Sequence, residues 1–219
     1  MNKLIDHTLL KANATKEQIL TLCKEAKEYD FASVCVNSYW VPTCKEALAN
    51  SNVKVCTVVG FPLGAMSSAA KAEETKIAIE QGAQEIDMVL NIGELIAGND
   101  EVVRKDIAAV VDAADGHIVK VIFETCLLTD EQIVKACQLC VEAKAGYVKT
   151  STGFNSAGAN PRVVKLMKDT VKNQALVKAA GGVRSIDDLQ EMVKAGASRI
   201  GTSSGVALMK GANTDPSSY

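Results

Sequence analysis

The sequence predicts an α/β fold, a single-domain (β/α)8 TIM barrel, on three observations. Short segments rich in valine and isoleucine alternate with longer amphipathic segments along the whole chain. Strict alternation of strands and helices is typical of a parallel sheet with right-handed crossovers. Eight strands and eight helices fit into 219 residues, and this count favours a closed barrel over an open doubly wound sheet. We therefore expect one domain over residues 1–219, ending in a flexible tail at about 211–219 that is rich in Gly, Pro, Ser, Asn and Asp.

The expected strands are short and apolar, as strands buried on both faces should be. They cover residues 4–7, 33–36, 53–59, 85–90, 118–124, 147–150, 176–180 and 199–202. The expected helices cover residues 16–29, 39–49, 67–82, 100–115, 130–145, 161–172, 186–195 and 203–210.

Capping signals support these helices. Thr15 and Thr129 each begin a T-x-x-Q capping box, and Pro161 suits the first turn of a helix. Gly82, Gly146 and Gly196 each come just past an expected helix and directly before a strand. We therefore expect one type of helix-to-strand turn to be used three times.

Composition and charge exclude several classes of protein. The net charge of −2 comes from well-mixed acidic and basic residues, so nothing indicates binding to nucleic acid. No segment has the apolar length of a signal peptide or a membrane span. Seven cysteines, an odd number, predict reduced thiols in the cytoplasm. Cys137 and Cys140 form a lone C-x-x-C within a helix, and the chain has two histidines, so we expect neither a metal site nor a redox-active cysteine pair.

Charged residues within the expected strands indicate the active site. They are Asp87, Lys120, Glu124, Lys149 and Lys178. Burial makes isolated charges costly, so an inward-facing, mutually paired cluster is the cheaper arrangement. In barrels of this kind the catalytic groups sit at the carboxyl ends of the strands.

Lys149 and Lys178 lie near the ends of neighbouring strands. Burial and a nearby positive charge both lower the pKa of a lysine, and a neutral amine is the form that attacks a carbonyl carbon. Lys149 is therefore the candidate nucleophile of a Schiff-base enzyme. The alternative is a pair of lysine and carboxylate that only neutralises a buried charge.

Glycine-rich loops follow the last three strands and predict a phosphate site. They contain Thr152-Gly153, Gly181-Gly182 and the segment from Gly201 to Gly205, which includes Ser203 and Ser204. Glycines let backbone N–H groups approach an anion, and Ser203 and Ser204 precede an expected helix. Loops after strands seven and eight frequently bind phosphate in such barrels.

Several motifs together resemble deoxyribose-phosphate aldolase. They are Val148-Lys149-Thr150-Ser151-Thr152-Gly153, the segment from Lys178 to Arg184, and Glu85-Ile86-Asp87-Met88-Val89. The similarity extends over the whole chain, from the segment Leu4 to Leu10 through Ser33–Asn37 and Val58–Gly64 to the terminal Tyr219. This pair of lysine motifs in this order is highly specific.

The resemblance implies a reversible, cofactor-free cleavage of 2-deoxy-D-ribose 5-phosphate to acetaldehyde and D-glyceraldehyde 3-phosphate, in the catabolism of deoxyribose phosphate. It implies that Lys149 forms the imine, that Lys178 keeps Lys149 reactive, and that Lys178 and Asp87 relay protons. Tyr219 is implied as a further proton donor. A homodimer is implied as well.

Further substrate contacts are expected from Asp6, Thr8, Cys35 and Lys120. As a buried thiol, Cys35 is also consistent with a role in packing alone. Phe154 departs from longer members of the family, which carry a lysine there for the phosphate. Arg184 is the nearest substitute, or else a solvated residue at the start of a helix. Arg199 is expected to reach solvent or a carboxylate at the bottom of the barrel.

Two rival functions remain open at this point. The first is another imine-forming barrel lyase of the transaldolase or dehydroquinase type, which would not need Lys178 and Asp87 in this spacing. The second is a non-catalytic phosphosugar sensor that retained only the phosphate loops. Fold alone decides nothing between these functions.

Overall fold

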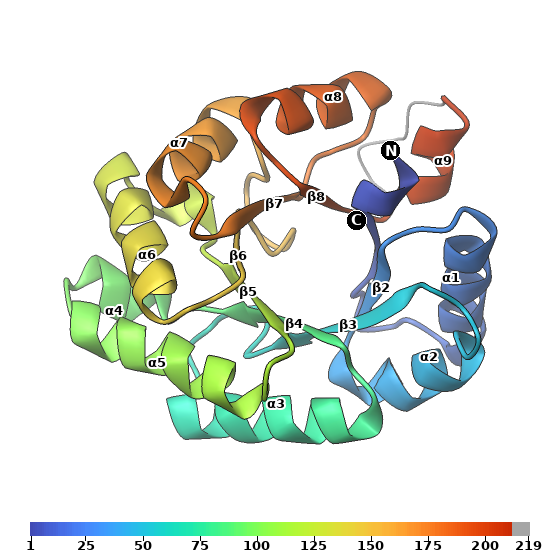
Figure 1. Cartoon of the computed structure of the whole chain (residues 1–219), viewed down its shortest axis with the longest axis horizontal. Coiled ribbons are helices and arrows are strands. Elements are labelled where there is room, and N and C mark those ends of the chain that lie inside the picture. The colour runs from blue at the N-terminus through green and yellow to red at the C-terminus, as the bar shows by residue number, and fades with distance from the viewer. Residues whose placement is uncertain (212–219) are drawn as a thin grey trace.

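The structure is a computed structural model that describes residues 1–211 and shows a closed barrel of eight parallel strands (Figure 1). Each strand pairs with its neighbours in chain order, and β8 pairs with β1 to close the barrel. The strands are β1 Ile5–Leu9, β2 Ser33–Val36, β3 Lys54–Val59, β4 Glu85–Val89, β5 Ile118–Ile122, β6 Tyr147–Lys149, β7 Leu176–Ala180 and β8 Arg199–Thr202. The predicted fold is confirmed, and three strands have the predicted bounds.

Helices form a ring outside the strands (Figure 1). They are α1 Lys16–Glu28, α2 Val41–Ala47, α3 Ser68–Gln81, α4 Ile92–Ile96, α5 Asp100–Ala113, α6 Asp130–Glu142, α7 Pro161–Val171, α8 Ile186–Ala195 and α9 Gly205–Met209. Short 3-10 helices cover Asn2–Leu4, Ser38–Trp40 and Thr125–Leu127. The sequence did not predict α4, and the helix expected over residues 203–210 is the five-residue α9. No helix within residues 1–211 has the length and apolar character needed to cross a membrane.

The helix ends follow most of the predicted signals. Both capping boxes form, at Thr15 and at Thr129, and Gly82 and Gly196 end their helices in the left-handed conformation, each with φ of +115°. The expectation for Gly146 is wrong. Helix α6 ends three residues earlier, and Lys144 takes the left-handed conformation with φ of +60°. The connection between α6 and β6 is one residue longer than the connections at Gly82 and Gly196, so this junction differs from the other two.

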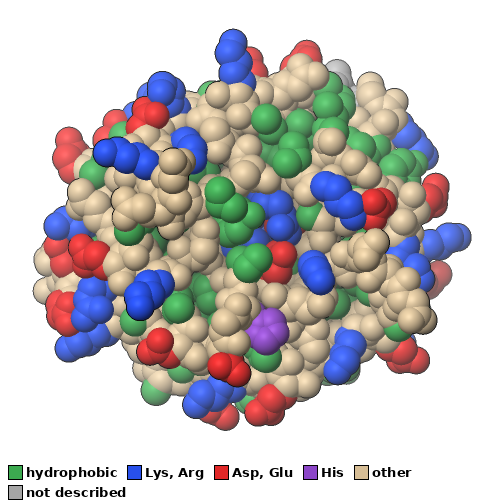
Figure 2. All heavy atoms as spheres, viewed as in Figure 1, with side chains coloured by type: hydrophobic (Ala, Val, Ile, Leu, Met, Phe, Trp, Pro, Cys, Tyr) green, Lys and Arg blue, Asp and Glu red, His purple; other side chains and the backbone are tan. Residues whose placement is uncertain are grey.

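Apolar residues pack in two separate regions. The larger core lies mainly between the strands and the helices and contains most of the buried apolar side chains. A small second cluster consists of Leu10, Cys35, Cys56 and Val58, with Phe61 packed against it. Figure 2 shows charged side chains of both signs at the centre of the barrel, next to hydrophobic side chains. The interior of this barrel is therefore largely ionic, whereas most barrel interiors are filled by apolar side chains.

Candidate active site

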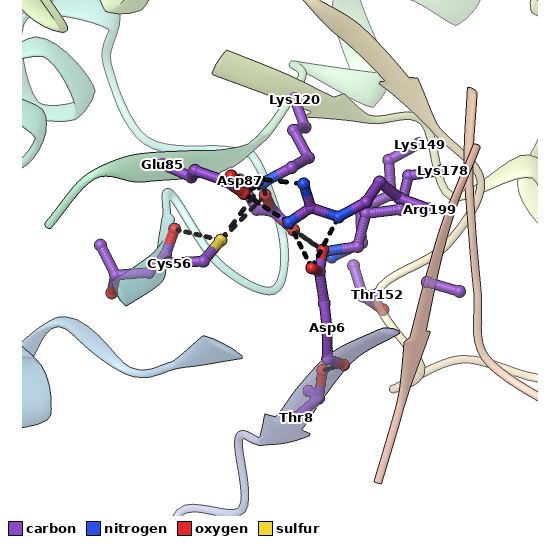
Figure 3. A network of polar contacts seen from close by, with 12 residues as sticks. Asp6, Thr8, Cys56, Glu85, Asp87, Lys120, Lys149, Thr152, Lys178 and Arg199 are labelled. Atoms are coloured by element: carbon purple, nitrogen blue, oxygen red, sulfur yellow. Dashed lines mark hydrogen bonds and ion pairs between the residues drawn. The ribbon is translucent and has the colours of Figure 1, made fainter. Parts of the chain in front are cut away.

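Asp87 on β4 lies at the centre of a group of buried polar side chains inside the barrel. It is fully buried, and its Oδ1 accepts a hydrogen bond from Lys120 Nζ at 2.8 Å and from the Cys56 thiol at 3.1 Å. Its Oδ2 accepts from Lys149 Nζ and Lys178 Nζ, both at 2.7 Å. Figure 3 shows these side chains converging from separate strands. The structure thus brings together the two predicted lysines and the predicted aspartate.

A second group of charges lies below Asp87, toward the amino ends of the strands. Glu85 and Arg199 are the first residues of β4 and β8. Arg199 contacts Glu85 at 2.8 Å and Asp6 through its Nε at 2.8 Å (Figure 3). The pairs Lys120–Glu85 and Lys178–Asp6, both at 2.6 Å, join this layer to the layer above. The prediction that Arg199 reaches a carboxylate at the bottom of the barrel is confirmed.

The ion-paired network contains more cations than anions. Its members among the described residues are the carboxylates of Asp6, Glu85 and Asp87 and the cations of Lys120, Lys149, Lys178 and Arg199. Lys120, Lys178 and Arg199 each pair with two carboxylates, whereas Lys149 pairs with one. Burial disfavours an uncompensated charge. The four cations and three carboxylates leave this buried network with an excess of positive charge.

The electrostatics of the network keep Lys178 charged. Burial by itself lowers the pKa of Lys178, but the carboxylates of Asp6 and Asp87 outweigh burial and raise this pKa above its ordinary value. The expectation that burial lowers the pKa of both lysines is therefore wrong for Lys178, because the sequence could not show that two carboxylates contact it. Burial likewise raises the pKa of Asp87, and Lys120, Lys149 and Lys178 overcome this effect and hold it well below its usual range. Lys178 therefore places a fixed cation on the strand next to Lys149, at the paired register position.

Contrary to the expectation from the sequence, Glu124 does not belong to the paired cluster. Strand β5 ends at Ile122, and Glu124 has a left-handed backbone with φ of +57°. Its carboxylate accepts hydrogen bonds from the backbone N–H of Thr152, at 3.3 Å, and from the Thr152 hydroxyl. Glu124 therefore anchors the loop after β6, and Thr152 uses its polar groups within the protein.

The glycines of the predicted phosphate loops serve different purposes. Gly181 and Gly182 have φ of +81° and +80°, and a Cβ at Gly182 would meet no atom within 4 Å. The backbone at Gly182 thus faces open space that a ligand can enter. Gly153 is also left-handed, with φ of +86°. A Cβ at Gly201 would lie 3.2 Å from Lys178 Cε, so this glycine makes room for the lysine.

The serines and Arg184 lie beside these loops. Ser203 is half-buried and Ser204 is buried, and both precede the short helix α9. The backbone N–H of Ser204 donates to the Thr202 hydroxyl at 3.0 Å, so it is already used within the protein. Arg184 is half-buried just before α8, and its backbone N–H donates to Asp188 at 3.0 Å.

The remaining predicted residues are placed as follows. The Thr8 hydroxyl donates to the Asp6 carbonyl at 2.8 Å. Cys35 is fully buried in the small interior cluster. Phe154 lies edge-on to Phe61 at 5.1 Å between ring centroids, which gives this loop an apolar contact in place of a charge. Tyr219 lies outside the described residues.

One group of described residues lies close enough together to hold a metal ion. One ligand atom from each of Cys35, Cys56 and Asp87 lies within 4.8 Å of the others, and all three residues are buried. The sequence led us to expect no metal site, because its lone C-x-x-C and two histidines indicated none. Cys35, Cys56 and Asp87 lie on three separate strands and share no motif that would reveal their proximity.

The family is decided by comparison with known proteins. A model of the DeoC/LacD family of aldolases matches residues 1–211. The chain belongs to this family. It is 60% identical over 210 residues to the deoxyribose-phosphate aldolase of Geobacillus sp. (strain WCH70), covering 95% of this chain and 94% of that protein. It is 59% identical over 219 residues to the deoxyribose-phosphate aldolase of Brevibacillus brevis, covering 100% of this chain and 99% of that protein.

Solved structures agree with this membership. An aldolase named QR15 superimposes with a TM-score of 0.92 at 36% identity, covering 95% of this chain and 94% of that chain. The tetrameric deoxyribose phosphate aldolase of Aeropyrum pernix superimposes with a TM-score of 0.89 at 34% identity, covering 95% of this chain and 89% of that chain. The DeoC family aldolases therefore share both the sequence and the barrel of this protein.

Proposed function

We propose that this DeoC family member cleaves 2-deoxy-D-ribose 5-phosphate reversibly into acetaldehyde and D-glyceraldehyde 3-phosphate, with Lys149 as the imine-forming amine. The observation that supports this most strongly is the surplus cation of the buried network, because Lys149 is the one lysine of the network with a single carboxylate partner. A neutral amine next to a fixed cation is the state needed for attack on an aldehyde. Relatives about 60% identical carry the name of this activity.

The reaction follows from the imine. Lys149 Nζ adds to the aldehyde carbon C1 of the open-chain sugar, and loss of water gives a protonated imine. Departure of the proton from the C3 hydroxyl breaks the C2–C3 bond and releases glyceraldehyde 3-phosphate, while the imine nitrogen accepts the electron pair as an enamine. Protonation at C2 and hydrolysis then release acetaldehyde and restore Lys149. The Asp87 carboxylate and the Lys178 ammonium lie within hydrogen-bond reach of each other and are the groups we assign to the proton transfers.

The substrate phosphate is assigned to the loops after β6, β7 and β8. The open space at Gly182 and the left-handed backbone at Gly153 and Gly181 support this placement. Ser203, Ser204 and Arg184 border these loops. Among the other residues expected to contact the substrate, Asp6 and Lys120 fix the charges of the network, and Gly201 leaves space for Lys178.

We further propose that the protein is a homodimer in the cytoplasm. All seven cysteines are free in the structure, which suits a reducing compartment. We expect Tyr219 to assist protonation at C2, as the family resemblance implies.

The substrate assignment is tested by product formation. The purified protein is expected to release glyceraldehyde 3-phosphate from 2-deoxyribose 5-phosphate, and to act much less efficiently on unphosphorylated 2-deoxyribose, because the latter lacks the phosphate contact. Binding of the sugar phosphate without any cleavage would instead indicate a sensor.

A further inference from the structure

Two thiols lie inside the barrel beside the ion-paired network, and no step of the proposed aldol reaction uses either of them. Cys35 on β2 and Cys56 on β3 are partners in the register of these strands, and both are fully buried. The Cys56 thiol donates to Asp87 Oδ1 at 3.1 Å, and Lys120 Nζ donates to its sulfur at 3.5 Å. Both sulfurs and one Asp87 oxygen lie within 4.8 Å of one another. A pair of thiols therefore adjoins the carboxylate that contacts Lys149.

We propose that Cys35, Cys56 and Asp87 form an inhibitory site for a divalent cation that binds sulfur ligands, such as Zn²⁺. Zinc bonds to sulfur at about 2.3 Å and to carboxylate oxygen at about 2.0–2.2 Å in tetrahedral sites. Ligand atoms in such a site are roughly 3.6–3.8 Å apart. Shifts of about 1 Å or less in these side chains would suffice to reach that geometry.

The positive charge of the barrel interior does not prevent this binding. Zinc takes thiolates as ligands, so each of the two cysteines loses one proton when the ion binds. One Zn²⁺ thus replaces two protons, and the net charge beside Lys120, Lys149 and Lys178 is unchanged. Hard cations such as Mg²⁺ prefer oxygen ligands and do not gain from the thiolates. The site is therefore selective for soft or borderline ions.

Metal binding to Asp87 would leave Lys149 without a carboxylate partner in the network, whereas Lys120 and Lys178 would each keep one. Lys120 retains Glu85 at 2.6 Å, and Lys178 retains Asp6 at 2.6 Å, when Asp87 turns to a metal. Lys149 has Asp87 as its one ion-pair partner in the network. Zinc would also occupy the carboxylate assigned to proton transfer. The inhibition of turnover rests on the proposed aldolase function, whereas the binding itself does not.

The chain offers matched controls for the thiol pair. Cys56→Ser retains a hydroxyl that can donate to Asp87, but oxygen in a neutral hydroxyl is a poor zinc ligand. Cys35→Ala removes the other sulfur. Cys126, in the 3-10 helix after β5, is half-buried and is the most accessible thiol of the described residues, so Cys126→Ser tests incidental binding.

Binding is measured directly with Co²⁺, which replaces zinc and shows a sulfur-to-cobalt charge-transfer band in the near ultraviolet. The experiment uses the full chain under a phosphine reductant that does not chelate metal. One equivalent of Co²⁺ is expected to give the band in the wild type and in Cys126→Ser. Loss of the band is expected in Cys56→Ser and in Cys35→Ala, each checked for folding by circular dichroism. Absence of the band in the wild type, or its persistence in both variants, would overturn the site.

Inhibition is measured on the same proteins as the initial rate of 2-deoxyribose 5-phosphate cleavage against Zn²⁺ concentration, normalised to the metal-free rate of each. The concentration for half-inhibition is expected to rise by about 100-fold in Cys56→Ser, since loss of one ligand greatly weakens a metal site. A chelator is expected to restore the wild-type rate. Equal inhibition of the wild type and Cys56→Ser would contradict the proposal. A wild type that binds Co²⁺ but turns over no substrate would refute the proposed function and leave the metal site standing.

Discussion

Two buried lysines of this protein contact an aspartate, and their surroundings differ. Lys71 on α3 contacts Asp106 on α5 at 2.6 Å and donates to the Val89 carbonyl at 2.9 Å. One cation faces one anion there, outside the barrel. Lys149 shares Asp87 with two other lysines inside the barrel. The comparison teaches that a buried, paired lysine does not by itself mark an active site, and that a surplus of cations distinguishes the proposed active site from the Lys71–Asp106 pair.

The pKa values show the same contrast. Burial lowers the pKa of Lys71, and the single carboxylate of Asp106 only partly offsets this effect. Two carboxylates reverse the effect of burial at Lys178. Lys178 therefore supplies a permanent charge to its neighbours, whereas Lys71 serves to join α3, α5 and the end of β4.

The largest expected effect is on catalysis at Lys149. Replacement by Met removes the nucleophile, so cleavage of 2-deoxyribose 5-phosphate should fall by about 10⁴-fold or more, while sugar-phosphate binding and folding persist. Coupled assays of glyceraldehyde 3-phosphate release measure the loss. Lys165→Met, on the exposed face of α7, is the matched control and should retain full activity. Near-normal turnover in Lys149→Met would remove this lysine from the mechanism.

Loss of Lys178 should have the next largest effect. Lys178→Met removes the fixed cation and one proton-transfer group, so kcat should fall by about 10²- to 10⁴-fold. The pH optimum should move upward, because the fixed cation beside the nucleophile is lost. A pH–rate profile shows both changes. An unshifted optimum would mean that the Lys178 cation does not set the pH dependence of the reaction.

The Lys71 pair should affect stability and leave turnover by the folded enzyme nearly unchanged. Lys71→Met leaves the Asp106 carboxylate buried without a cation, which should cost about 3–5 kcal/mol of unfolding free energy. The double variant Lys71→Met with Asp106→Leu should recover much of this loss. Urea unfolding of the three proteins measures the difference. A fall in kcat as large as that of Lys178→Met would show that the comparison between the two lysines is mistaken.

The smallest effect concerns stability near neutral pH. The pKa values of Asp6 and Asp87 are lowered, so their ion pairs stabilise the fold fully above the ordinary aspartate pKa of about 3.9 and lose this effect as the pH falls below it. The raised pKa of Lys178 makes its contribution complete below about 10.4, and this contribution is lost at higher pH. The free energy of unfolding, measured with urea as a function of pH, should therefore be constant between about pH 5 and pH 9. A marked decline between pH 6 and pH 8 would conflict with these ion pairs.

The sequence predicted the barrel and the central residues because alternation along a strand is a local property. Asp87, Lys149 and Lys178 were evident as charges in apolar strands. The contact of Arg199 with Asp6 could not be predicted in detail, because it depends on closure of the barrel between β8 and β1. Lys71 was missed because a lysine in an amphipathic helix is usually exposed.

Non-local packing also explains two other omissions. Gly201 makes room for Lys178 because Lys178 Cε lies close to its backbone, and no sequence spacing reveals this contact. The proximity of Cys35 and Cys56 depends on the register of β2 and β3. Residues on separate strands thus acquire a shared chemistry only through the tertiary structure.

The central claim is that Lys149 is the imine-forming amine, and chemical trapping tests it most directly. The protein is incubated with acetaldehyde, reduced with borohydride, digested and analysed by mass spectrometry. The account predicts a single ethyl adduct at Lys149, absent from Lys149→Met, with Lys120 and Lys178 unmodified. An adduct at Lys178 with Lys149 unmodified, or no adduct in an enzyme that cleaves the sugar phosphate, would contradict the account.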